Sequence, residues 1–385
     1  MPSDSSPIRV GIIGLGISES DFTPGLWAAK AHLPYLQASP AFRITAVANS
    51  SAKSAQTSID HHKLGSDVKA YGSPSDIAAD PNVDFIVVSV RVGTHYALTK
   101  PALLAGKDVF VEWPLAATLS QAEELTALAK EKGVKNIVGV QARASPLVIK
   151  LRSILKNNEI GTILSSTVNA TFSGLPHDMF PNGAEYYLDI NSGGNAFYIT
   201  FGHFFDSFTH VLGPFSSTLN AVFDLKYPRT KLVDFATMTQ HAELDRTAPD
   251  HVFVQGKLAS GTLASIAFRT VPAHAKEVED RFLTWTITGT EGEIVVIQKE
   301  GHWQMLESDG FVVKVRKGKG EVETVDLGAG VQLDSEAVLA NKPRERNVGR
   351  VYEAFLKGQS EDFATFEQAL ESQKLLARIR EAAGK

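Results

Sequence analysis

The chain has 385 residues, more than the roughly 250 to 300 at which a single hydrophobic core stops growing, so two domains are expected. Its 43% hydrophobic and 21% charged residues are typical of a globular protein. A formal net charge of −5 offers no basic surplus for phosphate backbones, which argues against direct nucleic-acid binding. Because the chain has no cysteine, disulfides and thiolate metal sites are excluded.

The N-terminal sequence MPSDSSPIRV lacks the basic stretch and apolar run of a secretory signal. No window approaches the ~20 apolar residues of a membrane-spanning helix. We therefore expect a cytoplasmic protein without a membrane partner, with the nucleus as an alternative location.

Residues 1–142 alternate short β-branched apolar runs with helical patterns, as parallel βαβ units do. This pattern predicts an α/β domain with a doubly wound (Rossmann) parallel sheet that binds a dinucleotide. We expect its five strands at residues 8–16, 43–50, 84–90, 108–113 and 136–142.

Local signals also predict where two helices of this domain begin and end. Ser120 and Glu123 have the spacing of a capping box, and Gly133 is expected to end the helix that follows. After Thr94, Pro101 lacks an N–H and is expected to kink its helix or delay its start.

Residues 143–385 have longer strands with polar alternation, joined by turns that contain glycine. This pattern predicts an α+β substrate and dimerisation domain with a large open, mostly antiparallel sheet. We expect C-terminal helices from about residue 345, assigned to this second domain.

A glycine turn follows the first predicted strand. Gly14 permits the tight turn, and Gly16 allows the backbone to approach a pyrophosphate at the next helix N-terminus, where Ile17 follows. Because Glu19 occupies the place of the third glycine, we interpret ISESDFTP as an insertion after which Gly25 resumes the helix. The turn predicts a dinucleotide site with a lengthened phosphate loop.

The end of the second strand predicts which dinucleotide binds. An acidic residue there receives the ribose hydroxyls in sites that prefer NAD. This chain instead has Asn49, Ser50 and, a few residues later, Lys53. Hydroxyls and a cation suit a 2′-phosphate, so NADP (NADPH) is the expected cofactor and NAD the alternative.

Six motifs occur in one order along the chain: GIIGLG, VSVRVGTHY, GKDVFVEWPLA, VGVQARASP, NEIGTI and GGNAFYITFGHFFD. In this order the chain resembles the glucose-fructose oxidoreductase, inositol dehydrogenase and MocA family over residues 8–380. The details resemble most the fungal subgroup that includes the yeast galactose/lactose metabolism regulatory protein, a nucleotide-binding transcription corepressor. The resemblance therefore implies two functional classes.

The resemblance also shows departures at the chemical centre. Family dehydrogenases have Glu-Lys-Pro where this chain has Glu112, Trp113 and Pro114, and an aspartate where it has Ile199. Trp113 has one N–H and no accessible pKa, so it cannot carry the proton of alcohol oxidation. His203 matches the family histidine, and an imidazole with its unperturbed pKa of ~6.5 suits that work.

Further site residues are implied by the resemblance. Candidate cofactor contacts besides the glycine turn and the second strand end are Val90, Arg91, His95, Glu112, Trp113 and Gln141. Candidate catalytic or substrate contacts are His203, Tyr198 and Trp113, with Tyr187 and Asp189 nearby in sequence. His32 lies in the family's His-x-Pro region. No metal is expected, because Phe204, Phe205 and Phe208 make the spacing of His203, Asp206 and His210 that of an amphipathic helix.

Our leading hypothesis is an NAD(P)-binding oxidoreductase that acts on a small polyhydroxylated or carbonyl compound, with His203 replacing the lost acid-base pair. One alternative is a non-catalytic nucleotide-binding regulator with a regulatory protein partner. Another is a non-redox isomerase or lyase on the same scaffold. By resemblance, a homodimer is expected in each case.

Overall fold

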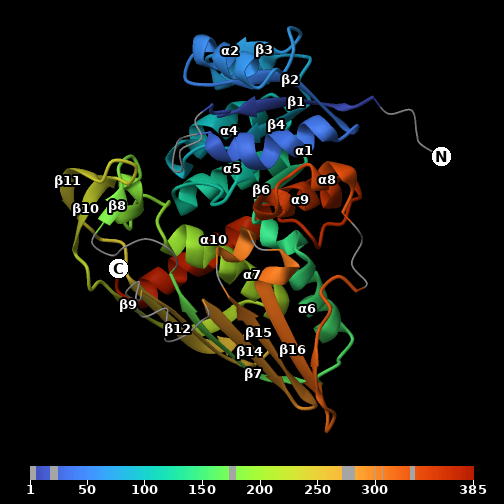
Figure 1. Ribbon diagram of the computed structural model, residues 1–385, viewed down its shortest axis with the longest axis vertical. Coiled ribbons are helices and arrows are strands. Elements are labelled where there is room, and N and C mark those ends of the chain that lie inside the picture. Colours follow the sequence, from blue (N-terminus) through green and yellow to red (C-terminus); the bar gives the residue numbers. More distant parts are fainter. Residues whose placement is uncertain are drawn as a thin grey trace. The chain divides into compact units, whose positions relative to one another are not determined.

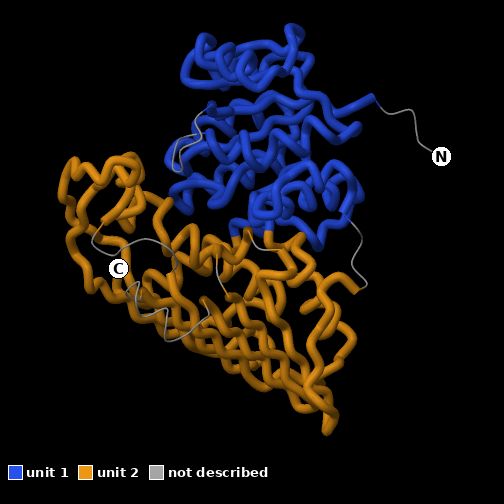
Figure 2. Tube along the Cα trace, in the orientation of Figure 1, with its two compact units in different colours: residues 1–141, 334–370 blue, residues 142–333, 371–385 orange. Residues whose placement is uncertain are grey.

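The computed structural model describes residues 6–17, 25–172, 179–270, 282–299, 301–305, 307–329 and 334–385. The chain divides into two compact units (Figure 2). Unit 1 comprises residues 1–141 and 334–370, and unit 2 comprises residues 142–333 and 371–385. The expected ISESDFTP insertion falls largely outside the described residues.

Unit 1 contains a six-stranded parallel sheet in the order β3-β2-β1-β4-β5-β6, which confirms the Rossmann fold (Figure 1). Its inner strands are buried on both faces, as the unbroken apolar run of β4 predicts. The strands are β1 (Ile8–Ile13), β2 (Phe42–Ala48), β3 (Lys69–Tyr71), β4 (Phe85–Val88), β5 (Asp108–Glu112) and β6 (Asn136–Gly139).

The sequence predicted five of these strands and missed β3, which is too short to show a period. The last predicted strand was also too long. β6 ends at Gly139, and a 3₁₀ turn, Gln141–Ala144, follows it.

The helices of unit 1 correct one prediction and part of another, because the kink predicted at Pro101 stays a prediction. In α5 (Leu119–Lys132), the cap is Thr118, whose Oγ1 accepts a hydrogen bond from the Gln121 amide, so the Ser120 capping box was wrong; Gly133 ends the helix as predicted. In α4 (His95–Leu104), Pro101 lies inside the helix and neither ends it nor delays its start. The other α-helices preceding β5 are α1 (Leu33–Ala38), α2 (Ala52–His61) and α3 (Pro74–Ala79).

The C-terminal helices α8 (Glu336–Leu339) and α9 (Arg346–Leu356) belong to unit 1, whereas the sequence assigned every helix from about residue 345 to the second domain. The Tyr352 ring of α9 stacks on Tyr35 of α1, with 5.1 Å between centroids. An apolar helix face is visible in the sequence, but the surface that covers it is not, so the assignment to a unit could not be read locally.

Unit 2 is built on an eight-stranded sheet in the order β17-β16-β15-β14-β7-β13-β12-β9 (Figure 1). Every neighbouring pair is antiparallel except β7 and β13, which confirms the predicted mostly antiparallel sheet. Its strands are β7 (Ile163–Thr171), β9 (Phe215–Asp224), β12 (His251–Leu258), β13 (Leu263–Arg269), β14 (Leu283–Gly289), β15 (Gly292–Gln298), β16 (Phe311–Lys317) and β17 (Val322–Thr324).

One face of this sheet packs against helices, which are α6 (Pro146–Lys156), α7 (Gly202–Leu212) and the end of α10 (Phe366–Ala382) (Figure 1). Phe204 and Phe208 of α7 lie against Trp285 of β14, at 5.6 and 5.5 Å between ring centroids. These aromatic contacts fix the helix that carries His203 onto the sheet.

A second, three-stranded sheet in unit 2 was not predicted. It has the order β11-β10-β8, with β8 (Met179–Pro181), β10 (Arg229–Asp234) and β11 (Thr239–Asp245). The side chains of β11 are nearly all exposed, so its sequence lacks the alternation that marks a half-buried strand. Among the described residues, no helix is both long and apolar enough to cross a membrane.

Candidate functional site

The glycine turn after β1 is closely packed against its own unit. Gly14 has φ +94°, and a Cβ there would overlap the side chain of Val90 and lie 2.6 Å from the Ser89 carbonyl oxygen. Gly25 has φ +80°, and a Cβ there would lie 2.6 Å from the Gly14 carbonyl oxygen. Only glycine fits both positions, so the chain keeps this turn as narrow as a dinucleotide-binding turn requires.

Side chains from β2 and α2 hold the turn through Leu15. The Asn49 amide accepts from Leu15 N and donates to Leu15 O, each at 3.0 Å. The Ser58 hydroxyl donates to the same carbonyl oxygen at 2.7 Å. The structure thus places Asn49, a predicted cofactor contact, against the backbone that the turn presents.

His62 also supports this turn and was not predicted. Its Nε2 lies 2.8 Å from the carbonyl oxygen of Gly16, so this nitrogen carries the proton and donates. No residue spacing in the sequence indicates this contact. A histidine just past a helix end is usually solvated, so its position gave no signal either.

No residue between the end of β2 and the N-terminus of α2 has a carboxylate side chain. Ser51 and Ser54 form a reciprocal capping box. Ser50 and Lys53 are both exposed beside it. A hydroxyl and an ammonium group at a helix N-terminus suit a phosphate better than ribose hydroxyls alone.

His95 joins the ends of two strands. Its Nδ1 lies 2.8 Å from the Pro114 carbonyl oxygen, and its Nε2 lies 3.0 Å from that of Val90. Burial lowers the pKa of His95, against the opposing effect of those carbonyls. Arg91, which follows Val90, is exposed. His95 therefore fixes the backbone of two predicted cofactor-contacting segments.

Trp113 is buried and precedes a cis peptide bond to Pro114. The preceding residue, Glu112, forms an ion pair with His32, with 2.7 Å between Oε1 and Nε2. The other ring nitrogen of His32 lies 2.8 Å from the Tyr352 hydroxyl. Since the carboxylate only accepts, Nε2 carries a proton and donates to it. Burial, with the charge of Glu112 adding to it, raises the pKa of Tyr352 well above its ordinary value.

Gln141 follows β6 and is buried, and its Oε1 has no hydrogen-bond partner within the described part of the chain. A buried amide oxygen without a donor is unusual, since such groups are nearly always paired. An N–H group of a ligand, such as a carboxamide, would satisfy it.

In unit 2, the segment after Gly193 and Gly194 starts the helix of His203. The Asn195 side chain accepts from the amides of Phe197 and Tyr198 at 3.0 and 3.3 Å. A π-helical turn, Phe197–Phe201, runs into α7, where His203 is buried. The predicted catalytic histidine therefore lies in a continuous helical segment whose first amides are capped by Asn195.

The neighbouring candidates differ in their contacts. The Asp189 carboxylate accepts from the Asn191 amide at 2.9 Å and from the Thr247 hydroxyl at 3.0 Å. Burial raises the pKa of Tyr187, which packs near Phe180. Tyr198 accepts from Arg380 Nη1 at 3.4 Å.

Asp206, which shares the helix with His203, is an ion-pair residue. Arg143 binds its carboxylate with two hydrogen bonds of 2.8 and 2.7 Å, and the Ser372 hydroxyl donates at 2.9 Å. Across the ranges that the structure describes, no group of three or more metal-ligating side chains was found.

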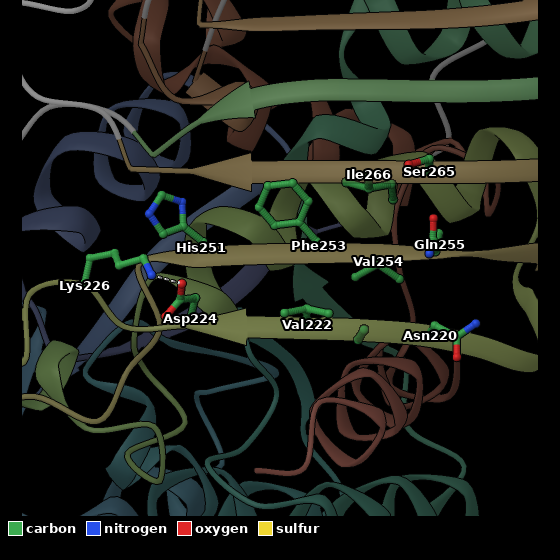
Figure 3. Close-up of a pocket in the computed structure, with 11 residues that line it drawn as sticks. Asn220, Val222, Asp224, Lys226, His251, Phe253, Val254, Gln255, Ser265 and Ile266 are labelled. Carbon is green, nitrogen blue, oxygen red and sulfur yellow. Dashed lines mark ion pairs between the residues drawn. The ribbon is translucent and has the colours of Figure 1, made fainter.

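A hollow of about 500 Å³ lies on the outer face of the large sheet, away from its covering helices (Figure 3). Side chains of β9, β12 and β13 line it, among them Val222, Phe253 and Gln255. None of the predicted catalytic or cofactor-binding residues lines this hollow. We therefore assign this hollow to the outer surface of the sheet and not to the candidate catalytic site.

Comparison with known proteins agrees with this architecture. Residues 8–140 match the family described as "Oxidoreductase family, NAD-binding Rossmann fold" (GFO_IDH_MocA), and residues 146–298 match "Gal80p, C-terminal domain". The chain belongs to this oxidoreductase family, with a Gal80-like C-terminal domain.

Its relatives include both regulators and dehydrogenases. The galactose/lactose metabolism regulatory protein GAL80 of Saccharomyces cerevisiae is 29% identical over 76% of this chain and 67% of its own length. Dehydrogenase aclE of Aspergillus oryzae is 28% identical over 98% of this chain and 97% of its own. D-xylose 1-dehydrogenase (NADP(+)) of Hypocrea jecorina is 30% identical over 74% and 69%.

Solved structures show the same fold. Transcriptional regulator Gal80p of Kluyveromyces lactis has a TM-score of 0.82 at 26% identity, covering 100% of this chain and 94% of its own. Levoglucosan dehydrogenase in complex with NADH and L-sorbose has a TM-score of 0.74 at 20% identity, covering 98% and 97%.

Proposed function

We propose that this protein is an NADP(H)-dependent oxidoreductase that acts on a small polyhydroxylated or carbonyl compound. The observation that carries the proposal is the narrow glycine turn at Gly14 and Gly25, where an added Cβ would lie 2.6 Å from a backbone carbonyl oxygen at either position, so that only glycine fits. The relatives with dehydrogenase names support the same class, and one of them, aclE, matches the chain over nearly its whole length.

The residues present fit this cofactor. Gly14 to Gly16 would contact the pyrophosphate, and Ser50 with Lys53 would contact a 2′-phosphate. Gln141 Oε1 would accept from the nicotinamide carboxamide, and Trp113 would contact the ring. When bound, the nicotinamide supplies the hydride acceptor or donor.

His203 is the proposed proton-transferring residue. Of the three positions at which the family has a lysine, an aspartate and a histidine, only His203 retains a side chain suited to general acid-base work. Neither Trp113 nor Ile199 has a side chain that moves a proton.

A matched pair of variants tests this role. His203→Gln and His203→Ala should bind NADPH as the wild type does, while kcat falls about 10²- to 10⁴-fold, the usual contribution of one general acid or base. Full turnover by His203→Ala would remove this histidine from the mechanism. Product formed without any change in reduced nicotinamide would identify a non-redox isomerase or lyase instead.

A regulator is the second candidate, because Trp113 and Ile199 both remove proton-carrying groups that a binding protein does not need. The matches to two GAL80 proteins support it. The double variant Trp113→Lys/Ile199→Asp restores the family's residues. If the wild type binds NADPH but turns over no substrate in a polyol and aldose screen, whereas the double variant does, the regulator is favoured.

We also propose a homodimer that forms through the outer face of the large sheet. Val222 and Phe253 are 63% and 44% exposed there (Figure 3). Leu263 of β13 is 56% exposed, and exposed apolar groups of this kind mark contact surfaces. Val222→Arg/Phe253→Arg should yield a monomer by light scattering, and an unchanged mass would exclude this face. For either function, we propose the cytoplasm as the location, with the nucleus as the alternative.

A further inference from the structure

Arg380 lies in the last turn of α10, where it binds three neutral oxygens of unit 2. Its Nη2 donates to Asn191 Oδ1 at 2.7 Å. Its Nη1 lies 3.5 Å from the Ile190 carbonyl oxygen and 3.4 Å from the Tyr198 hydroxyl. The two Nη1 contacts are long and therefore weak. The guanidinium is held by its neighbours, but its N–H groups could still donate stronger hydrogen bonds.

No described carboxylate forms an ion pair with this half-buried guanidinium. Asp189, two residues before Asn191, has its carboxylate engaged by the Asn191 amide and the Thr247 hydroxyl. Arg143, a buried arginine of unit 2, is by contrast paired with Asp206. The C-terminal end of α10 favours a cation at position 380, but it provides no planar pair of acceptors for the guanidinium fork.

The segment that Arg380 contacts leads directly to His203. Asn195 Nδ2 donates to the Asp189 carbonyl oxygen at 2.9 Å, and its Oδ1 accepts from the amides that start the helix. Tyr198 lies in the π-helical turn that continues into α7. An anion bound by Arg380 would therefore lie beside the same loop that positions the proposed proton-transferring residue.

We infer that Arg380, together with the Tyr198 hydroxyl, binds the carboxylate of the substrate, so that the substrate is a small hydroxy carboxylate rather than a neutral polyol. The inference rests on the proposed function and specifies its substrate class. Arginine is suited to this task because its fork matches the two oxygens of a carboxylate, and such charge-assisted hydrogen bonds are the strong ones.

The test compares carboxylates with their neutral counterparts on the full chain. The probes are D-galacturonate against D-galactose, D-glucuronate against D-glucose, and D-gluconate against D-glucitol. Binding is read by saturation-transfer NMR with and without NADP⁺, and turnover is read by nicotinamide absorbance. We expect at least one carboxylate to bind and to react with a kcat/KM at least about tenfold above that of its neutral counterpart.

Variants on one helix separate recognition from folding. Arg380→Gln should lower carboxylate kcat/KM about 10- to 100-fold and leave the neutral counterpart within about twofold. Arg380→Lys keeps the charge and should recover part of the loss. Arg378→Gln is the matched control: Arg378 is also half-buried on α10 and donates to the Ser216 carbonyl oxygen, and its loss should leave the preference unchanged.

The experiment separates failure of the carboxylate site from failure of the proposed function. If NADPH binds but no carboxylate does, or if Arg380→Gln lowers both members of a pair equally, the inference is overturned while the dehydrogenase proposal stands. If NADPH does not bind, the proposed function fails, and Arg380-dependent binding of a carboxylate in the NMR experiment still supports the anion site.

Discussion

His32 Nε2 lies 2.7 Å from Glu112 Oε1, although 80 positions separate the two residues in the chain. Glu112 immediately precedes Trp113, which stands where the family has a lysine. The contact therefore fixes the residue next to this altered position. Tyr352 of α9 completes the group from the C-terminal segment. The ion pair and Tyr352 thus connect three segments of unit 1 next to Trp113, the proposed contact of the nicotinamide.

Removing His32 should destabilise unit 1 strongly. His32→Ala leaves the Glu112 carboxylate without its partner in a mostly buried position, and breaking a buried pair costs about 3 to 5 kcal/mol. Tyr352→Phe removes one hydrogen bond and should cost about 1 to 3 kcal/mol. Urea unfolding measures both free energies. His61→Ala, at an exposed position, is the control, and equal losses for His61 and His32 would refute the buried pair.

Gly14→Ala should abolish tight nucleotide binding. The added Cβ would overlap Val90 and the Ser89 carbonyl oxygen, so the turn has to widen. Gly106→Ala is the matched control, since Gly106 also has a positive φ of 69° but has nothing within 4 Å of the added Cβ. Both variants place an alanine at a positive φ, and only Gly14→Ala should lose NADPH affinity in calorimetric titration. Equal affinities would place the pyrophosphate elsewhere.

Lys53→Glu should change the choice of cofactor. Reversing this exposed charge beside Ser50 repels a 2′-phosphate but not ribose hydroxyls. We expect NADPH affinity to fall about tenfold or more while NADH affinity changes little, because charged hydrogen bonds contribute about 1.5 to 3 kcal/mol. Lys130→Glu, on exposed α5 surface, controls for net charge. A parallel loss of NADPH and NADH affinity would exclude selective recognition by Lys53.

Arg143→Met should lower the stability of unit 2 at neutral pH by about 3 to 5 kcal/mol, because it leaves Asp206 buried without its cation. Burial alone would raise the pKa of Asp206, but the charge and hydrogen bonds of Arg143 hold it below its ordinary value. This contribution to stability is therefore complete above the unfolded pKa of about 3.9 and is lost as the pH falls through the folded pKa.

The difference in unfolding free energy between wild type and Arg143→Met should accordingly shrink as the pH falls below about 4, where Asp206 takes up a proton first in the unfolded chain and only at lower pH in the folded protein. Arg43→Met is the comparison, since Arg43 and Asp67 form an ion pair whose side chains are both 61% exposed. Its cost should stay below about 1 kcal/mol at every pH. A constant difference for Arg143→Met across the acid range would contradict the role assigned to Asp206.

The sequence predicted the architecture because its strands have strong local periods. The all-apolar run of β4 marks a strand buried on both faces, and the alternation in β12 marks one buried on a single face. The edge strands β3 and β11 were missed, since one is too short and the other too exposed to show a period. Local patterns also could not show that α9 packs in unit 1, because that depends on the distant ring of Tyr35.

Candidate site residues can be named from the sequence where a motif defines them, but not where only a contact in the fold does. Gly14 and Gly16 stand in a recognisable turn, and His203 follows a glycine pair. His62 and Arg380, by contrast, reach their partners from the ends of helices, at sequence separations of 46 and 189 residues from Gly16 and Asn191. Nothing in their own neighbourhoods indicates those contacts. The contacts of Asn49 and His95 to backbone likewise required the fold.

Direct titration tests whether this chain binds NADP(H) at the glycine turn. Purified protein is titrated with NADPH and NADH while tryptophan quenching and energy transfer to the reduced nicotinamide are recorded. We expect saturable binding of NADPH, weaker binding of NADH, and reduced energy transfer in Trp113→Phe. Absence of saturable binding by either nucleotide would contradict both the dehydrogenase and the nucleotide-dependent regulator.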